Sequence, residues 1–201
     1  MAITKCNGTV TKNVAPDCAK EWVAGLLDTA IAWHFSDLEL TYDAANKNKI
    51  TGYTVRSGAK PFAIYADEKM PFADASTTVN TETVKNTYNK TIPFTMPIGG
   101  AEASKEVIDP IVQSTEGFIV FAKTKNKVAD GAVVVFGSHT GLICSEGTRN
   151  YTDPNLGAAF KSTMTETGAS SETVTFVGDD ATPTYATVMA AWDEMMALVT
   201  Y

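Results

Sequence analysis

The amino-acid sequence predicts an α+β fold: an antiparallel β-sandwich or partly closed barrel with about three packed helices and a long polar arm. Thr and Val recur throughout the chain, and β-branched side chains favour strands. The hydrophobic share of 44% with 19% charged residues suits a protein that buries a core and excludes a disordered chain. Three segments place their apolar residues at helical spacing. The 201 residues are expected to form a single domain, because no repeat or interdomain linker is found.

The first part of the chain is predicted to be a helix followed by strands. In residues 15–28, Asp17 can cap a helix whose apolar residues share one face. Residues 31–42 alternate as a strand does, but the apolar parity changes midway, which predicts a β-bulge near Ser36 and Asp37. Further strands are expected at 50–56 and 61–66.

A long polar arm is predicted at residues 67–87. This segment contains Asp, Glu, Lys, Thr and Asn, with few large apolar groups. A loop of this length is unusual in a compact monomer unless it has a purpose, so we expect a hairpin or extended loop that reaches a neighbouring molecule. The residues predicted to form this assembly arm are Asp67, Glu68, Lys69, Met70, Asp74, Thr83 and Asn86.

The strongest strand signals lie in the middle of the chain. Residues 118–124 and 132–137 are two apolar segments whose connection ends in Asp130-Gly131, as in a hairpin. The second segment is wholly apolar, which predicts a central strand. Residues 139–145 are expected to extend it.

The remaining elements follow from the same patterns. A strand is expected at 90–97, and a helix at 102–115 that Pro110 kinks or restarts. The other predicted elements are a pair of strands at 158–166 and 173–177 and a C-terminal helix at 184–198.

No pattern in the sequence predicts a cofactor or a metal site. The three cysteines, Cys6, Cys18 and Cys144, are too widely spaced for a disulfide framework or a zinc site and are expected to be reduced. Asp179-Asp180 lacks the further oxygen ligands of an EF-hand loop and is interpreted as a turn. Neither a Walker A nor a G-x-G-x-x-G sequence is present.

The two histidines are the main candidates for catalysis. His34 lies in an alternating segment and is interpreted as a histidine at the edge of the core. His139 follows Ser138, but neighbours on a strand point to opposite faces, so Ser138 is not expected to be activated by His139. We therefore predict that the protein is not an enzyme. A catalytic site near His139 is the least favoured alternative.

The charge of the chain bears on its partners. A net charge of −7 and a pI of about 4.8 disfavour tight binding of nucleic acid, which requires clustered Lys and Arg. No apolar run approaches the ~20 residues of a membrane span. No secretory signal is recognised, so folding in a cytoplasm without a membrane partner is expected.

Residues 85–142 resemble the tail-tube subunits of phages and related injection machines. The likeness lies in a strand, the helix at 102–115 and the hairpin at 118–138, preceded by the arm and followed by a late strand within 174–185. It implies a virion structural protein, assembled in the host cytoplasm into stacked rings. Its partners would be copies of itself (hexamers), other virion proteins, and DNA passing through a lumen without specific binding. An acidic lumen would repel phosphates.

Other roles stay open at this point. The C-terminal helix departs from the tail-tube pattern, which leaves a capsid-decorating or head-tail joining protein as an alternative. A β-sandwich binding module for a glycan or a protein is a further alternative. It predicts a stable monomer with an exposed aromatic patch.

Overall fold

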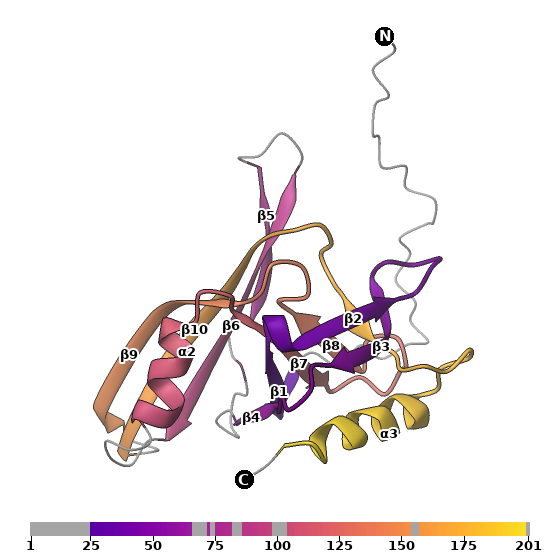
Figure 1. The fold of residues 1–201 in the computed structure, drawn as a ribbon. Helices are drawn as coiled ribbons and strands as arrows, with labels where there is room; N and C mark the ends of the chain where they lie inside the picture. Colours follow the sequence, from indigo (N-terminus) through magenta and orange to yellow (C-terminus); the bar gives the residue numbers. More distant parts are fainter. Residues whose placement is uncertain are drawn as a thin grey trace.

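The computed structural model describes residues 25–65, 72, 75–81, 86–97, 104–153 and 157–199, and the strands in these ranges form two sheets (Figure 1). The seven-stranded sheet contains β1 (Leu26–His34), β2 (Leu38–Tyr42), β3 (Lys49–Val55), β4 (Phe62–Tyr65), β7 (Phe118–Thr124), β8 (Val133–Phe136) and β11 (Thr175–Phe176). The four-stranded sheet contains β5 (Ser76–Asn80), β6 (Thr87–Pro97), β9 (Ile143–Asp153) and β10 (Gly157–Ala169).

Both sheets are largely antiparallel, as the sequence predicts. The seven-stranded sheet has the order β2-β3-β11-β8-β7-β1-β4, in which only the β11–β3 pair is parallel. The four-stranded sheet has the order β5-β6-β10-β9 and is antiparallel throughout. Within the described ranges neither sheet closes on itself, so the sandwich prediction holds in outline and the partly closed barrel does not.

Helix α3 (Tyr185–Met196) covers one face of the seven-stranded sheet (Figure 1). Thr184 caps it, since its side chain accepts a hydrogen bond from the Thr187 amide. Trp192 is buried against the sheet, and Lys123 Nζ lies 5.1 Å from the centre of its indole ring. The other buried members of this core include Ile31, Trp33, Ile50, Ile119, Phe121, Val133, Val135, Phe176, Val188 and Met195.

The opposite face of the seven-stranded sheet packs on the four-stranded sheet and on α2 (Asp109–Gln113). The buried residues of this second core include Ala30, Ala32, Ile64, Ile92, Phe94, Ile111, Phe118, Val120, Ala122, Leu142 and Met164. Strands β1 and β7 are therefore covered on both faces. This explains why residues 30–33 of β1 and 118–122 of β7 are apolar and buried without a break.

Several predicted elements are confirmed. The hairpin β7–β8, with β8 in the interior of its sheet, and the C-terminal helix lie where the sequence places them. Helical residues 104–113 comprise the π-helical turn η2 (Ser104–Ile108) and α2, and Pro110 stands in the first turn of α2. The change of parity after His34 is real, but its cause is the 3₁₀-helix η1 (Phe35–Asp37) and not a bulge.

Further predictions are wrong. Leu26–Asp28, the end of the first predicted helix, belong to β1, because pairing of β1 with β7 outweighs helical spacing; residues 15–24 lie outside the described ranges. Residues 139–145 do not extend β8: after Leu142 bridges to Phe118, the chain enters β9 in the other sheet. The described part has two regular helices besides its short turns.

A further wrong prediction is the pairing of residues 158–166 with residues 173–177. Strand β10 pairs with β6 and β9 in the four-stranded sheet. Strand β11 joins β3 and β8 in the seven-stranded sheet. The intervening segment therefore crosses between the sheets.

None of the helices in the described part is long and apolar enough to cross a membrane.

The turn that leads from β8 into β9 requires glycine at residue 137. Gly137 has a φ of +77°, and a Cβ atom built there would lie 2.1 Å from the carbonyl oxygen of Phe118. This oxygen belongs to the backbone of β7, so it can move only if the pairing of β7 moves with it. A side chain at this position therefore conflicts with both the local conformation and the packing.

We predict that Gly137→Ala lowers the free energy of unfolding by about 3 kcal/mol or more, because conformational strain and the overlap add. The matched control is Gly58→Ala. Gly58 also has a positive φ, +83°, but no atom lies within 4 Å of the added Cβ, so a loss of about 1 kcal/mol is expected. Urea titration measures both, and equal losses would contradict the role of the Phe118 contact.

Candidate functional site

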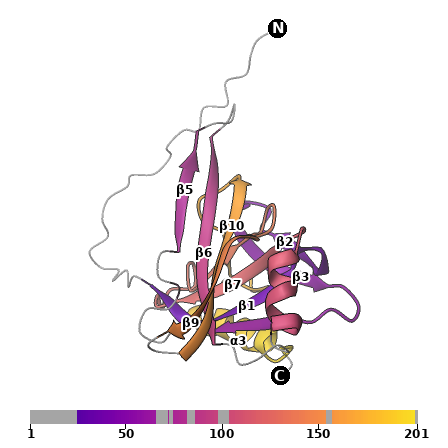
Figure 2. The ribbon, with the colours of Figure 1, turned by 90° about the vertical axis from the view of Figure 1, so that its left-hand side faces the viewer.

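The predicted assembly arm coincides in part with strand β5. Strand β5 pairs with the first part of β6, from Ser76 opposite Thr91 to Asn80 opposite Thr87. Figures 1 and 2 show this hairpin standing out from the rest of the protein. Asn86 is exposed just before β6. The other predicted arm residues, Asp67, Glu68, Lys69, Met70, Asp74 and Thr83, lie outside the described ranges.

The four-stranded sheet ends in an open edge on each side. Strand β5 forms one edge and β9 the other, and neither pairs with a further strand in the described part of the chain. Every side chain described in β5 and β9 is at least partly exposed, including Val79, Ile143 and Tyr151. Charged side chains and Pro commonly prevent pairing at an edge. Strand β5 contains none of them, and β9 has no Lys or Pro but carries Glu146, Arg149 and Asp153.

The outer face of this sheet is rich in hydroxyl groups. Residues paired across antiparallel strands share a face, so Thr165 lies beside Thr91, and Thr163 beside Pro93 and Glu146. Lys161 opposes Thr95 and Thr148 on the same face. The charged side chains that the described register places here are thus Lys161 and Glu146, amid many threonines.

A buried carboxylate holds the turn between β8 and β9. Glu166 of β10 is fully buried, and its Oε1 accepts hydrogen bonds from the amides of His139 (2.8 Å) and Thr140 (3.2 Å). Its Oε2 accepts the amide of Gly137 at 2.9 Å. Charge-assisted hydrogen bonds of this kind offset the cost of burying the carboxylate.

Lys90 supplies the opposite charge. It faces Glu166 across the β6–β10 pair, and its Nζ lies 3.8 Å from Glu166 Oε2, an ion pair too long for a hydrogen bond. Nζ has no hydrogen-bond partner among the described residues. Burial lowers the pKa of Lys90, an effect that the Glu166 carboxylate partly offsets. At 1% exposure the amine is inaccessible to a substrate, so a structural role fits it better than a catalytic one.

Ser138 and His139 do contact each other, which corrects the argument from strand geometry. They lie in a turn, and Ser138 Oγ is 3.1 Å from His139 Nδ1. However, Glu166 Oε1 lies 3.9 Å from that same nitrogen. In a Ser-His-acid triad the hydroxyl and the carboxylate engage opposite nitrogens of the ring. This arrangement lacks that geometry, and Ser138 is itself buried.

The other described residues that the sequence suggests for catalysis or metal binding take part in packing or in hydrogen bonds. The His34 ring packs 4.8 Å from that of Phe118, in agreement with a position at the core edge. Asp180 accepts the Thr182 amide in a turn. Cys144 Sγ lies 3.1 Å from Ser162 Oγ, while Cys6 and Cys18 fall outside the described ranges. No cluster of three potential metal ligands occurs in the part of the chain described.

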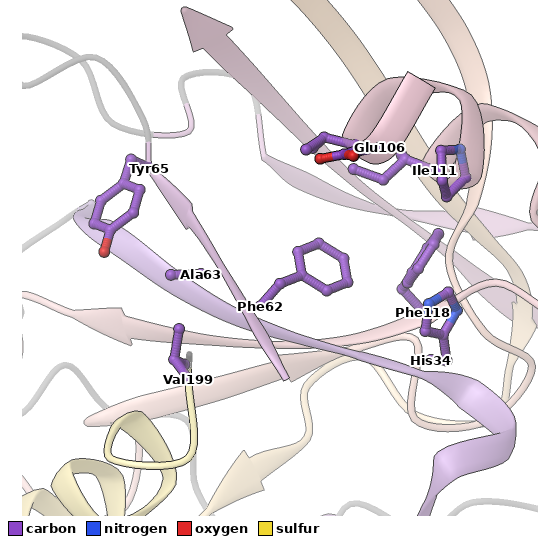
Figure 3. A pocket seen from close by; sticks show the side chains of 10 residues that line it. His34, Phe62, Ala63, Tyr65, Glu106, Ile111, Phe118 and Val199 are labelled. Atoms are coloured by element: carbon purple, nitrogen blue, oxygen red, sulfur yellow. The ribbon is translucent and has the colours of Figure 1, made fainter. Parts of the chain in front are cut away.

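An apolar groove of about 300 Å³ crosses the open edge of the seven-stranded sheet (Figure 3). Edge strand β4 contributes Phe62 and Ala63, which point to opposite faces of the sheet. The groove therefore wraps around the edge of β4. The other lining residues are His34, Tyr65, Glu106, Val107, Pro110, Ile111, Phe118 and Val199. The sequence does not predict this groove, because its walls come from segments far apart along the chain, at residues 34, 62–65, 106–118 and 199.

Comparison of the chain with protein families, curated proteins and solved structures gives no match. The function must therefore be inferred from the geometry of the protein itself.

We predict that Glu166→Gln lowers the free energy of unfolding by about 3 kcal/mol. The side-chain NH₂ of glutamine would face one of the three backbone N–H donors, which would then lose its acceptor. Lys90 would also be left buried without a counter-charge. Glu146→Gln, at an exposed position, should change stability by less than about 0.5 kcal/mol. A Glu166→Gln protein as stable as the Glu146→Gln control would contradict the structural role of the carboxylate.

The turn also predicts a dependence of stability on pH. Burial lowers the pKa of His139. The Lys90 ammonium lowers this pKa as well, and the Glu166 carboxylate raises it, but burial has the largest effect. Below its ordinary pKa of about 6.5, the unfolded chain therefore binds the proton more readily than the folded one, so stability falls as the pH falls. His139→Gln should lose less stability than wild type between pH 7.5 and 5.5, measured by urea unfolding. Identical pH profiles for wild type and His139→Gln would contradict this prediction.

Proposed function

We propose that this protein is a self-assembling structural subunit whose copies join through the two open edges of the four-stranded sheet, as the tail-tube subunit of a phage virion. The observation that carries the proposal is that β5 and β9, on opposite sides of one sheet, pair with no further strand in the described residues. Unpaired N–H and C=O groups on an edge are a template for pairing with another chain. Pairing between copies would satisfy these groups.

The two edges differ, which favours a ring or a tube over a simple dimer. Edge β9 spans 11 residues and edge β5 spans 5. Joining β5 of one copy to β9 of the next is a head-to-tail contact. Such contacts generate closed rings if the rotation between copies closes, and filaments if it does not. The number of copies in a ring, six by resemblance, depends on that rotation.

The projecting hairpin supports assembly as well. Among the described strands β5 pairs with β6 alone, from Thr87 to Thr91. Val79 of β5 is 58% exposed. Contact with a neighbouring copy would bury this side chain and stabilise the edge strand.

The outer face of the sheet suits a channel for DNA. Sheets joined edge to edge would present a continuous surface of threonine hydroxyls with Lys161 and Glu146 as its charged side chains in the described register. Such a surface lacks the clustered basic residues that hold phosphates. A hydroxyl-lined lumen then replaces the acidic lining expected from the net charge, and DNA would still pass without tight binding.

The alternatives have less support. A glycan-binding module is expected to expose clustered aromatic rings. The exposed tyrosines of the described part, Tyr65, Tyr151 and Tyr185, lie instead on β4, β9 and α3. A capsid-decorating or head-tail joining protein would also be structural, and the shape of the assembled particle separates these roles from a tube.

We predict that Thr148→Lys together with Thr152→Lys, both exposed on β9, abolishes assembly without unfolding the subunit. Charged lysines on an edge strand oppose pairing with another chain. Multi-angle light scattering and negative-stain imaging should show rings or tubes for wild type and monomers for the variant.

The matched control carries the same two charges elsewhere. Ala186→Lys with Ala190→Lys, exposed on α3, should assemble as wild type does. Wild-type protein that remains monomeric at every concentration would count against the proposal, as would tubes formed by the β9 variant.

A further inference from the structure

The groove at β4 has the features of a site for an extended peptide. Strand β4 is the outermost strand of its sheet in the described residues, so its edge can accept one more strand. The groove takes residues from both faces of β4, next to that edge. In recognition by strand addition, the edge supplies the backbone hydrogen bonds and adjacent pockets select alternate side chains.

The chemistry of the groove specifies the side chains that it accepts. Its walls are mainly apolar and aromatic, with the rings of Phe62 and Phe118 5.6 Å apart at one end. Glu106, an exposed acidic residue of η2, lines the groove beside Val107 and Ile111 (Figure 3). An apolar residue followed two positions later by Lys or Arg would place both side chains on the groove side of an added strand.

The chain itself contains such a segment, outside the described residues. Residues 10–14 read Val-Thr-Lys-Asn-Val, so that Val10, Lys12 and Val14 would share one face of a strand. Residues 1–14 contain two lysines and no acidic residue, whereas the whole chain has a net charge of −7. The segment is thus complementary in charge to the rest of the protein.

We propose that the groove at β4 binds residues 10–14 of a second copy of this chain as an added strand, with Lys12 paired to Glu106 and the two valines in the apolar groove. This contact rests on the proposed self-assembly, and it is separate from the edges of the four-stranded sheet. It would tie copies together through the seven-stranded sheet. Residues 15–24 would then act as a tether between the docked strand and β1.

The test uses two full-length variants in which Cys6, Cys18 and Cys144 are replaced by Ser. One also carries Ala63→Cys in the groove and the other Asn13→Cys in the segment. A short bismaleimide should crosslink the mixture into a product that contains both chains. Moving the first cysteine to the exposed face of α3, as Ala190→Cys, should abolish that product.

Substitutions in each partner test the chemistry. Val10→Asp with Val14→Asp should lower the yield of crosslinked product about tenfold or more, because two apolar contacts are lost. Glu106→Gln should lower it several-fold and weaken its dependence on salt, while Lys105→Gln, a neighbouring exposed position, should not. Equal yields for all these variants would overturn the proposal.

The outcomes separate this proposal from the assembly through β5 and β9. Rings that form without any crosslink at residue 63 would overturn the docking and leave the edge assembly intact. Crosslinked pairs in a protein that forms no larger particle would support the docking and count against rings. A third variant carries both Ala63→Cys and Asn13→Cys in one chain. A crosslink within single chains of this variant, with no product between the two single-cysteine variants, would overturn the proposal of a second copy.

Discussion

The buried carboxylate of Glu166 fixes the position at which the chain passes from one sheet to the other. It accepts three backbone amides of the turn after β8 and lies opposite Lys90 on β6. One side chain of the four-stranded sheet thereby holds a turn of the seven-stranded sheet. Because a buried charge without partners is costly, the fold is stable only when this turn, β10 and β6 are assembled together. The glycine at residue 137 allows the amides to approach the carboxylate.

This constraint places the four-stranded sheet so that only one of its faces is covered. Its inner face packs on the seven-stranded sheet, whose other face packs on α3. The three layers bury most of the large apolar residues of the described chain, and threonine is the commonest residue on the outer face. In the described residues its edge strands β5 and β9 pair with no further strand, and β6, β9 and β10 are 11, 11 and 13 residues long. A long, tall sheet with a polar outer face and two open edges is suited to forming the wall of a larger assembly.

The sequence predicts the elements whose apolar residues either repeat at helical spacing or form an unbroken run. Helix α3 is of the first kind and the hairpin β7–β8 of the second. Strand β9 was missed beyond Ser145 because an edge strand exposed on both sides carries no apolar alternation. The pairing of β10 was missed for another reason: its partner β6 lies far away along the chain, and local patterns do not encode which strands meet.

In the candidate site, too, local patterns predict some features, whereas others depend on which strands pair. Composition predicts an arm at residues 67–87, but strand β5 within this segment could be located only through its pairing with β6. Lys90 and Glu166 left one signal in the sequence: each is an isolated charge within a strand-like segment. Their pairing depends on the register of β6 and β10. The segment of Ser138 and His139 is predicted to be a turn or a strand end, and it is a turn held by Glu166. Only the argument that the two side chains point apart, which holds for a strand, is wrong, because they touch.

The central claim is that copies meet at the edges of the four-stranded sheet, and amide hydrogen exchange at low and high protein concentration tests it most directly. The account predicts that amides of β5 and β9 become protected at high concentration, when particles form. Amides of β2, the far edge of the seven-stranded sheet, should exchange at the same rate in both conditions. Protection gained at β2 while β5 and β9 remain unchanged would contradict the account.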